Sequence, residues 1–151
     1  MFKDKTIVYT SGTFDMFHYN HLRMINYARS LADILIVGVS TDELVASYKP
    51  KPIIPFTERL QIIEALKTPD IVIPQHSLDH TDLVKKLNMD AFVVGDDWFG
   101  KYDYLNELGV KVFYFPYGTG VSSSNLRKTI HDSYEEQLRL QRQAKPSIKE
   151  K

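Results

Sequence analysis

Short apolar runs recur along this chain, and stretches with helical spacing separate them. The runs span residues 6–10, 34–39, 71–73, 91–94 and 110–115. Runs that are apolar throughout are typical of strands buried on both faces, as in parallel sheets. Their alternation with helices predicts an α/β fold: a Rossmann-like open five-stranded parallel sheet with helices on both faces.

The segments between the runs predict helices. Apolar residues recur at helical spacing over about 19–31, and Thr57 is expected to cap a helix that runs to about Lys67. Further helices are expected over a short stretch from Asp42, over 82–87, over 103–108, and from Ser122 or Ser123 past Ile130. We expect a single domain over residues 1–132, followed by a polar helical extension and tail over 133–151.

Composition excludes several classes of partner and site. Lys plus Arg and Asp plus Glu each number 19, so no global field attracts nucleic acid or an anionic membrane. The absence of Cys excludes disulfides and thiolate metal sites and suits a reducing cytoplasm. The N-terminus lacks a long apolar region, and no apolar run approaches the ~20 residues of a membrane span. We therefore expect a cytoplasmic protein that binds neither nucleic acid nor membranes.

Four unusual segments each follow a predicted strand: residues 11–21, 40–55, 95–101 and 116–124. Right-handed crossovers bring the carboxyl ends of parallel strands to one edge of the sheet. Ligands of open α/β sheets bind at that edge. The sequence therefore predicts a binding site there.

The first segment carries two histidines after a turn. Residues 12–15 read Gly-Thr-Phe-Asp, and His18 and His21 follow at a spacing that gives them one face of a helix start. A helix N-terminus favours anions, and imidazoles there can donate to a triphosphate and stabilise a leaving pyrophosphate. The histidines alone are also compatible with solvated residues or half of a metal site.

This segment resembles the GTFD…HxGH signature of the cytidylyltransferases in the HxGH nucleotidyltransferase superfamily. The resemblance covers about residues 6–131. It implies direct attack by a phosphorylated acceptor on the α-phosphorus of CTP, with Mg²⁺ on the phosphates, and it suggests a homodimer. It also implies catalytic roles for His18 and His21 and nucleotide contacts by Thr13, Phe14 and Asn20. Asn20 replaces the family's Gly, and Asn is the least costly other residue at positive φ.

The second segment, residues 95–101, reads Gly-Asp-Asp-Trp-Phe-Gly-Lys. It resembles the GDDWxGK stretch of glycerol-3-phosphate cytidylyltransferases. The resemblance implies that this loop lies near the cytidine and its ribose, through Gly95, Asp96, Asp97 and Trp98. The alternative is an acidic loop with a buried Trp.

The third segment, residues 120–127, begins a helix with hydroxyls that suit phosphate oxygens. It resembles the family's second signature, which reads RTEGISTT in cytidylyltransferases and ISSTxxR in adenylyltransferases. Tyr117 and Thr119 replace the cytidylyltransferase Arg and Glu, while Arg127 matches the adenylyltransferase Arg. We expect Arg127 to supply the phosphate-binding charge that Tyr117 lacks. The resemblance implies nucleotide contacts by Ser122, Ser123 and Ser124. The alternative is a capped surface helix with an ordinary Arg.

Further charged residues enter by the same resemblance. Lys49 lies in the loop that closes over the phosphates in the resembling enzymes, although a solvated loop is the alternative. Five residues are expected near the acceptor: Asp15, Asp42, Arg59, Lys67 and Tyr117. Lys67 replaces a family Arg and keeps its charge but not its bidentate geometry. Three other histidines are interpreted as surface residues without a role: His76, His80 and His131.

These features predict a CTP-dependent cytidylyltransferase that makes a CDP-linked product and pyrophosphate. Glycerol 3-phosphate is the leading acceptor by resemblance, and phosphocholine, phosphoethanolamine or phosphoglutamine are the others considered. Such products feed wall or capsule polymers or lipid head groups. An adenylyltransferase is the second enzymatic hypothesis. A nucleotide-binding module without catalysis is the hypothesis from another class. Mg²⁺ is expected on the phosphates, with no metal ligand assigned to a protein side chain.

Overall fold

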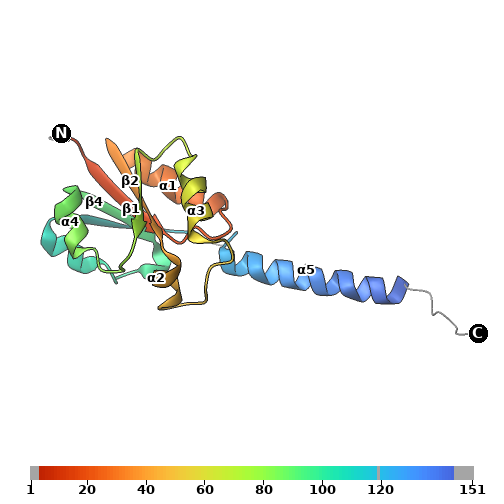
Figure 1. The fold of residues 1–151 in the computed structure, drawn as a ribbon. Coiled ribbons are helices and arrows are strands. Elements are labelled where there is room, and N and C mark those ends of the chain that lie inside the picture. The colour runs from red at the N-terminus through yellow and green to blue at the C-terminus, as the bar shows by residue number, and fades with distance from the viewer. Residues whose placement is uncertain (1–3, 119, 145–151) are drawn as a thin grey trace, which may run out of the picture. The chain divides into compact units, whose positions relative to one another are not determined.

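The computed structural model describes residues 4–118 and 120–144. The chain divides into two compact units, residues 1–120 and residues 121–151. Within the described ranges, the first unit contains the sheet and the second contains one helix (Figure 1). No helix within the described ranges is long and apolar enough to cross a membrane.

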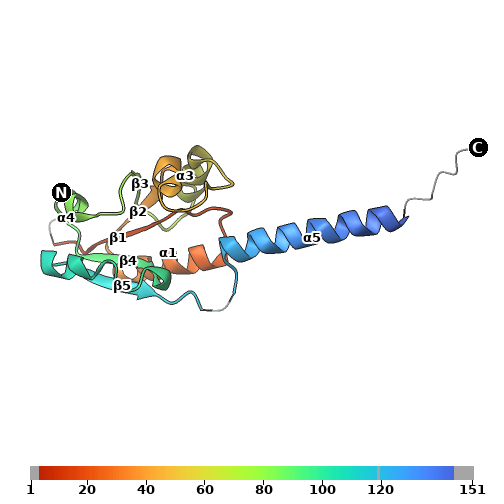
Figure 2. The ribbon, with the colours of Figure 1, turned by 90° about the horizontal axis from the view of Figure 1, so that it is seen from below.

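The first unit contains a five-stranded sheet whose strands are all parallel. The strands are β1 (Ile7–Gly12), β2 (Ile34–Ser40), β3 (Ile71–Gln75), β4 (Ala91–Gly95) and β5 (Lys111–Phe115). Their order is β3-β2-β1-β4-β5, which the labels follow in Figure 2. The predicted Rossmann-like sheet is confirmed, because every apolar run forms a strand.

The connections contain α1 (Tyr19–Leu31), α2 (Asp42–Ala46), α3 (Phe56–Glu64), α4 (Thr81–Leu87) and two 3₁₀ helices, η1 (Asp96–Trp98) and η2 (Asp103–Leu108). The helix expected to start after Thr57 begins at Phe56 with Pro55 as its N-cap, and it ends before Lys67. The sequence pattern did not predict η1. It also did not separate the 3₁₀ geometry of η2 from an α-helix, because six residues are too few to define the period.

Alternating residues of the central strands build two hydrophobic layers. Val8, Val37 and Val93 pack with residues of α1 and α3 on one face of the sheet. Tyr9 and Phe92 point to the other face, where residues of α4 and η2 cover them. Figure 1 shows α1 and α3 on the side of the strands opposite to α4. Helices therefore cover both faces, and this burial explains the apolar runs.

A buried polar chain joins β1, β2 and β3. The Tyr9 hydroxyl donates to Gln75 Oε1 over 2.9 Å, and Gln75 Nε2 donates to Ser40 Oγ over 3.2 Å. Gly38 leaves room for this hydroxyl, because a Cβ there would lie 1.9 Å from it. Satisfied polar groups of this kind fix the register of strands whose apolar residues alone could slip.

The strand order reverses between β1 and β4, because the chain leaves β3 at one edge and returns on the other side of β1. This switch point is where open α/β sheets bind ligands, outside the carboxyl ends of the strands. The segment after β1 and η1 after β4 flank it directly. Two of the predicted site segments therefore lie where the topology favours a ligand.

The second unit contains α5 (Ser123–Ala144), one continuous helix. Ser122 caps it, because its Oγ accepts the N–H of Asn125 over 3.0 Å and its carbonyl accepts that of Leu126. This confirms the predicted serine cap. The helix passes residue 133 without a break. The last part of the predicted tail, residues 145–151, lies outside the described residues.

The interpretation of His80 as a surface residue is wrong. Its side chain is fully buried, stacked on Tyr102 with ring centroids 5.0 Å apart and edge-on to Tyr9 and Phe92. Neither ring nitrogen has a hydrogen-bond partner within the described part of the chain. Burial lowers the pKa of His80 to about 4. The sequence did not indicate the burial of His80, because its neighbours, Asp79 and Thr81, are polar.

We predict that His80 makes the protein less stable in weak acid. The unfolded chain protonates this imidazole near pH 6.5 but the folded chain only near pH 4, so stability falls as the pH falls through that window. The loss reaches about 3 kcal/mol. Urea unfolding at several pH values measures it. His80→Phe should flatten this part of the slope, while the exposed His76→Gln should not; equal slopes in both variants would contradict the assignment.

Candidate active site

The turn after β1 contains two residues with an unusual backbone conformation. Phe14 and Met16 have φ of 55° and 49°, a region that residues other than Gly seldom adopt. The buried Phe14 ring lies against Gly12, where a Cβ would be 3.1 Å from it. Such strained positions cluster at functional sites. Because the Phe14 side chain belongs to the core, its predicted nucleotide contact would have to come from its backbone.

The two predicted histidines stack at the start of α1. Their ring centroids are 3.6 Å apart with an interplanar angle of 21°. The N–H of His18, the N-cap residue, donates to Nδ1 of His21 over 3.2 Å. An Nδ1 that accepts leaves the proton of a neutral ring on Nε2, so His21 Nε2 is a donor. Neither ring nitrogen of His18 has a protein partner among the described residues.

Both imidazoles are electrically neutral at pH 7. Burial lowers the pKa of His21 to about 3, with further lowering by His18 and Lys49 and an opposing effect of Asp15. Burial also lowers the pKa of His18. The first turn of α1 contains no acidic residue. The start of α1 therefore offers neutral N–H donors and a helix N-terminus to an anion.

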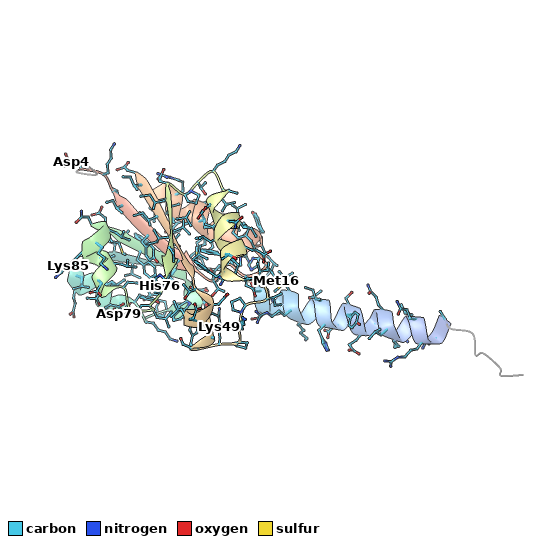
Figure 3. The ribbon with its side chains drawn as sticks, viewed as in Figure 1. Asp4, Met16, Lys49, His76, Asp79 and Lys85 are labelled. Atoms are coloured by element: carbon cyan, nitrogen blue, oxygen red, sulfur yellow. The ribbon has the colours of Figure 1, made fainter. Side chains whose placement is uncertain are left out.

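The loop after α2 meets the loop after β4. The rings of Tyr48 and Trp98 lie 5.7 Å apart, and Lys49 Nζ lies 5.5 Å from the Tyr48 centroid. Lys101 Nζ lies 5.2 Å from the centroid of the Trp98 ring. Figure 3 shows Lys49 and Met16 at the carboxyl edge of the strands and Asp4 at the opposite edge. The sheet thus brings the predicted lysine and the predicted Trp together, as the strand order requires.

Tyr117, after β5, closes the other side of η1. A Cβ on Gly95 would lie 2.1 Å from the Tyr117 ring, so only Gly fits beneath it. The Tyr117 hydroxyl contacts Met24 Sδ at 3.2 Å. Burial raises the pKa of Tyr117, and Asp97 and Asp96 raise it further. Burial and Asp96 also raise the pKa of Asp97. Tyr117 therefore places a neutral aromatic ring at the position where the family signature has an Arg.

Arg59, predicted to contact the acceptor, is a buried structural centre. Its guanidinium is fully buried and donates to the carbonyls of Thr13, Ser40 and Ile54 over 2.6–2.8 Å. It also forms an ion pair with Asp42 at 2.8 Å. Four of its five donors are used within the protein, so Arg59 holds the ends of β1 and β2, and its acceptor contact stays a prediction.

Two predicted acidic residues also serve the scaffold. Asp15 is 3% exposed and accepts the N–H groups of Ile53 and Ile54, each over 2.9 Å. Burial acts to raise the pKa of Asp42, but hydrogen bonds from Arg59 and from the Phe56 N–H outweigh it and lower that pKa. These carboxylates fix the loop before α3.

The acceptor contact of Lys67 stays a prediction. Lys67 is exposed in the turn between α3 and β3, which lies at the amino edge of the sheet. Asn20 lies within α1 and has no positive φ, so the conformational reason given for it was wrong. The Asn20 side chain is buried and accepts a hydrogen bond from Arg23.

The sequence did not indicate three further side chains at this edge: Tyr48, Met24 and Arg23. Tyr48 is adjacent to the predicted Lys49, and Met24 and Arg23 follow Asn20 by one helical turn, which was the available signal. The roles predicted for Ser122–Ser124 and Arg127 concern the second unit and stay predictions. Thr119 lies outside the described residues.

Comparisons with known proteins agree with this arrangement. The profile of the cytidylyltransferase-like family matches residues 9–129. This chain belongs to that family. The cytidylyltransferase-like chain is 38% identical over 122 residues to glycerol-3-phosphate cytidylyltransferase of Bacillus spizizenii, covering 80% of this chain and 94% of that protein. It is 40% identical over 95 residues to ethanolamine-phosphate cytidylyltransferase of Arabidopsis thaliana, covering 60% of this chain and 23% of that protein.

The family fold extends to solved structures. The lipopolysaccharide core biosynthesis protein of Thermoplasma volcanium aligns with a TM-score of 0.64 and 26% identity, covering 78% of this chain and 99% of that one. The motifs that carried the resemblance, residues 12–21 and 95–101, lie inside the matched range and flank the switch point. The predicted family and its fold are therefore confirmed.

We predict that Arg59→Met destabilises the protein by about 3–5 kcal/mol, because it leaves the Asp42 carboxylate and buried carbonyls without their donor. Arg59→Lys should lose less, since it keeps the charge but not the fork. Chemical denaturation measures both, with the exposed neighbour Glu58→Gln as the control. A loss in Arg59→Met no larger than that in the control would contradict the structural role.

Proposed function

We propose that this protein is a cytidylyltransferase that moves CMP from CTP to glycerol 3-phosphate and releases pyrophosphate. The observation that carries the proposal is the stacked pair of neutral imidazoles, 3.6 Å apart, at the start of the helix that leaves β1 at the switch point. Its position matches where phosphates bind in such sheets. Similarity to glycerol-3-phosphate cytidylyltransferases over most of the chain supports the choice of acceptor.

The reaction is a displacement at phosphorus. An oxygen of the acceptor phosphate forms a bond to the α-phosphorus of CTP, and the bond from that phosphorus to the oxygen bridging to the β-phosphate breaks. The electron pair leaves with pyrophosphate. A phosphate monoester is already anionic, so the protein needs no strong base, and its task is to position the reactants and stabilise charge.

The imidazoles stabilise the leaving group in this mechanism. His21 donates through Nε2, because its Nδ1 is held by the His18 N–H. His18 presents a ring without another protein partner among the described residues, and Lys49 adds a positive charge from the facing loop. Donors that are fixed before the reaction stabilise developing charge without reorganisation.

The nucleoside is proposed to lie over η1, beside Trp98, as the family resemblance implies. Mg²⁺ would supply charge neutralisation on the phosphates. No cluster of three or more His, Asp or Glu within the described ranges could hold a metal. A cytoplasmic homodimer that makes a precursor of a wall or capsule polymer completes the proposal.

The decisive assay measures pyrophosphate release from CTP or ATP with Mg²⁺ across a panel of acceptors: glycerol 3-phosphate, phosphocholine, phosphoethanolamine and phosphoglutamine. We expect the highest kcat/KM with CTP and glycerol 3-phosphate, and loss of activity with EDTA that Mg²⁺ restores. Faster release with ATP would indicate an adenylyltransferase. Nucleotide binding without release for any pair would indicate a binding module.

We predict that His18→Ala and His21→Ala each lower kcat by at least about a hundredfold, because each removes a donor that acts in the transition state. Steady-state kinetics with saturating CTP measures the effect, and circular dichroism confirms that the variants fold. His76→Gln, an exposed change beyond β3, is the control. Near-wild-type turnover in both alanine variants would reject the assigned role.

A further inference from the structure

One face of α1 lies along the end of β5 and the segment that follows it. Met24 Sδ receives the Tyr117 hydroxyl at 3.2 Å. A Cβ on Gly120 would lie 3.5 Å from Asn20 Nδ2, so that amide lies close to the Gly120 backbone. Arg23 lies 5.3 Å above the centroid of Phe115. Residues 20, 23 and 24 share this face by helical spacing.

Arg23 is held in place from two directions. Its Nη1 donates to Asn20 Oδ1 over 3.1 Å, and Phe115, itself 6% exposed, provides a fixed aromatic surface beneath the guanidinium. The centroid of the Tyr19 ring lies 5.9 Å from the Arg23 guanidinium carbon. A guanidinium on an aromatic face gains cation–π energy and keeps its in-plane donors available. An unconstrained surface Arg would have neither contact.

Arg23 places a positive charge beside the end of β5, and the loop that follows β5 lacks the Arg of the family signature. Tyr117 replaces the Arg of the cytidylyltransferase signature, and its ring lies 5.9 Å from Phe115. Asn20 replaces the Gly of that signature and holds Arg23. Both departures from the family pattern therefore lie beside Arg23 or beside the ring that it covers.

We propose that Arg23 is a phosphate-binding residue of this enzyme and that Asn20 is its positioning residue. This inference rests on the proposed function, because it assigns the phosphate to a substrate of that reaction. The guanidinium uses one donor on Asn20 among the described residues and offers others to phosphate oxygens. The phosphate belongs either to the nucleotide or to the acceptor, and the two are separated by experiment.

The test compares Arg23→Met, Arg23→Lys, Asn20→Gly and the double variant Asn20→Gly/Arg23→Met. Lys111→Met is the matched control, because it removes a cation at the amino end of β5, opposite to Phe115. Steady-state kinetics gives KM for CTP, KM for glycerol 3-phosphate and kcat. Calorimetry gives the affinity for CTP and for inorganic pyrophosphate without turnover, and thermal melting checks the fold.

Arg23→Met should raise one KM about tenfold to a hundredfold, with Arg23→Lys intermediate and Lys111→Met unchanged. A change in KM for CTP with weaker pyrophosphate binding assigns the triphosphate; a change confined to glycerol 3-phosphate assigns the acceptor. Asn20→Gly should raise the same KM by less and add little in the double variant. Additive effects would overturn the role of Asn20.

Unchanged KM values and unchanged affinities in Arg23→Met would overturn the proposal for Arg23. If the wild-type protein releases no pyrophosphate, the proposed reaction fails. Calorimetry with CTP and pyrophosphate then tests Arg23 independently, and equal affinities in the wild type and Arg23→Met would overturn the inference on its own.

Discussion

A single buried guanidinium holds the carboxyl edge of this sheet together. Arg59 links the carbonyls at the ends of β1 and β2 to the loop before α3, and its ion pair with Asp42 fixes α2. An Arg can do this because its planar fork presents several donors at fixed angles. The turn that carries the histidines begins at Thr13, one of the groups that Arg59 binds. The geometry of the region where a phosphate is proposed to bind therefore depends on a buried scaffold residue.

The edge built around this centre separates two kinds of charge. Carboxylates of the scaffold, Asp15 and Asp42, are satisfied by backbone N–H groups and by Arg59. Cations and neutral donors face the region where an anion is proposed to bind. Such an arrangement binds phosphates with groups fixed in advance, and this preorganisation is the main source of stabilisation in phosphoryl-type displacements.

The sequence predicted the sheet and its edge well, because both follow from local patterns. Runs such as 34–39 are typical of strands buried on two faces, and the strand order then brings residues 12–21 and 95–101 together. The burial of Arg59 and His80 could not be predicted, since each lies among polar neighbours and charged or titratable residues are seldom buried. The contact of Tyr117 with Gly95 joins segments far apart in the chain, which no local pattern encodes.

The positions of Asn20 and Lys67 show the same limit. The role of Asn20 at the site stays a prediction, but its expected positive φ was wrong, because its conformation depends on where α1 begins. Lys67 was assigned by resemblance, and the helix expected to run to about Lys67 ends three residues earlier. Boundaries of elements decide which edge of the sheet a residue reaches, and boundaries are the least certain part of a sequence-based prediction.

The low proton affinity of His21 has a consequence for catalysis in acid. With a pKa of about 3, this imidazole keeps its form while the medium is acidified through pH 6. A phosphate monoester loses its second negative charge in that same range. The nucleophile of the proposed reaction therefore weakens before His21 changes its protonation.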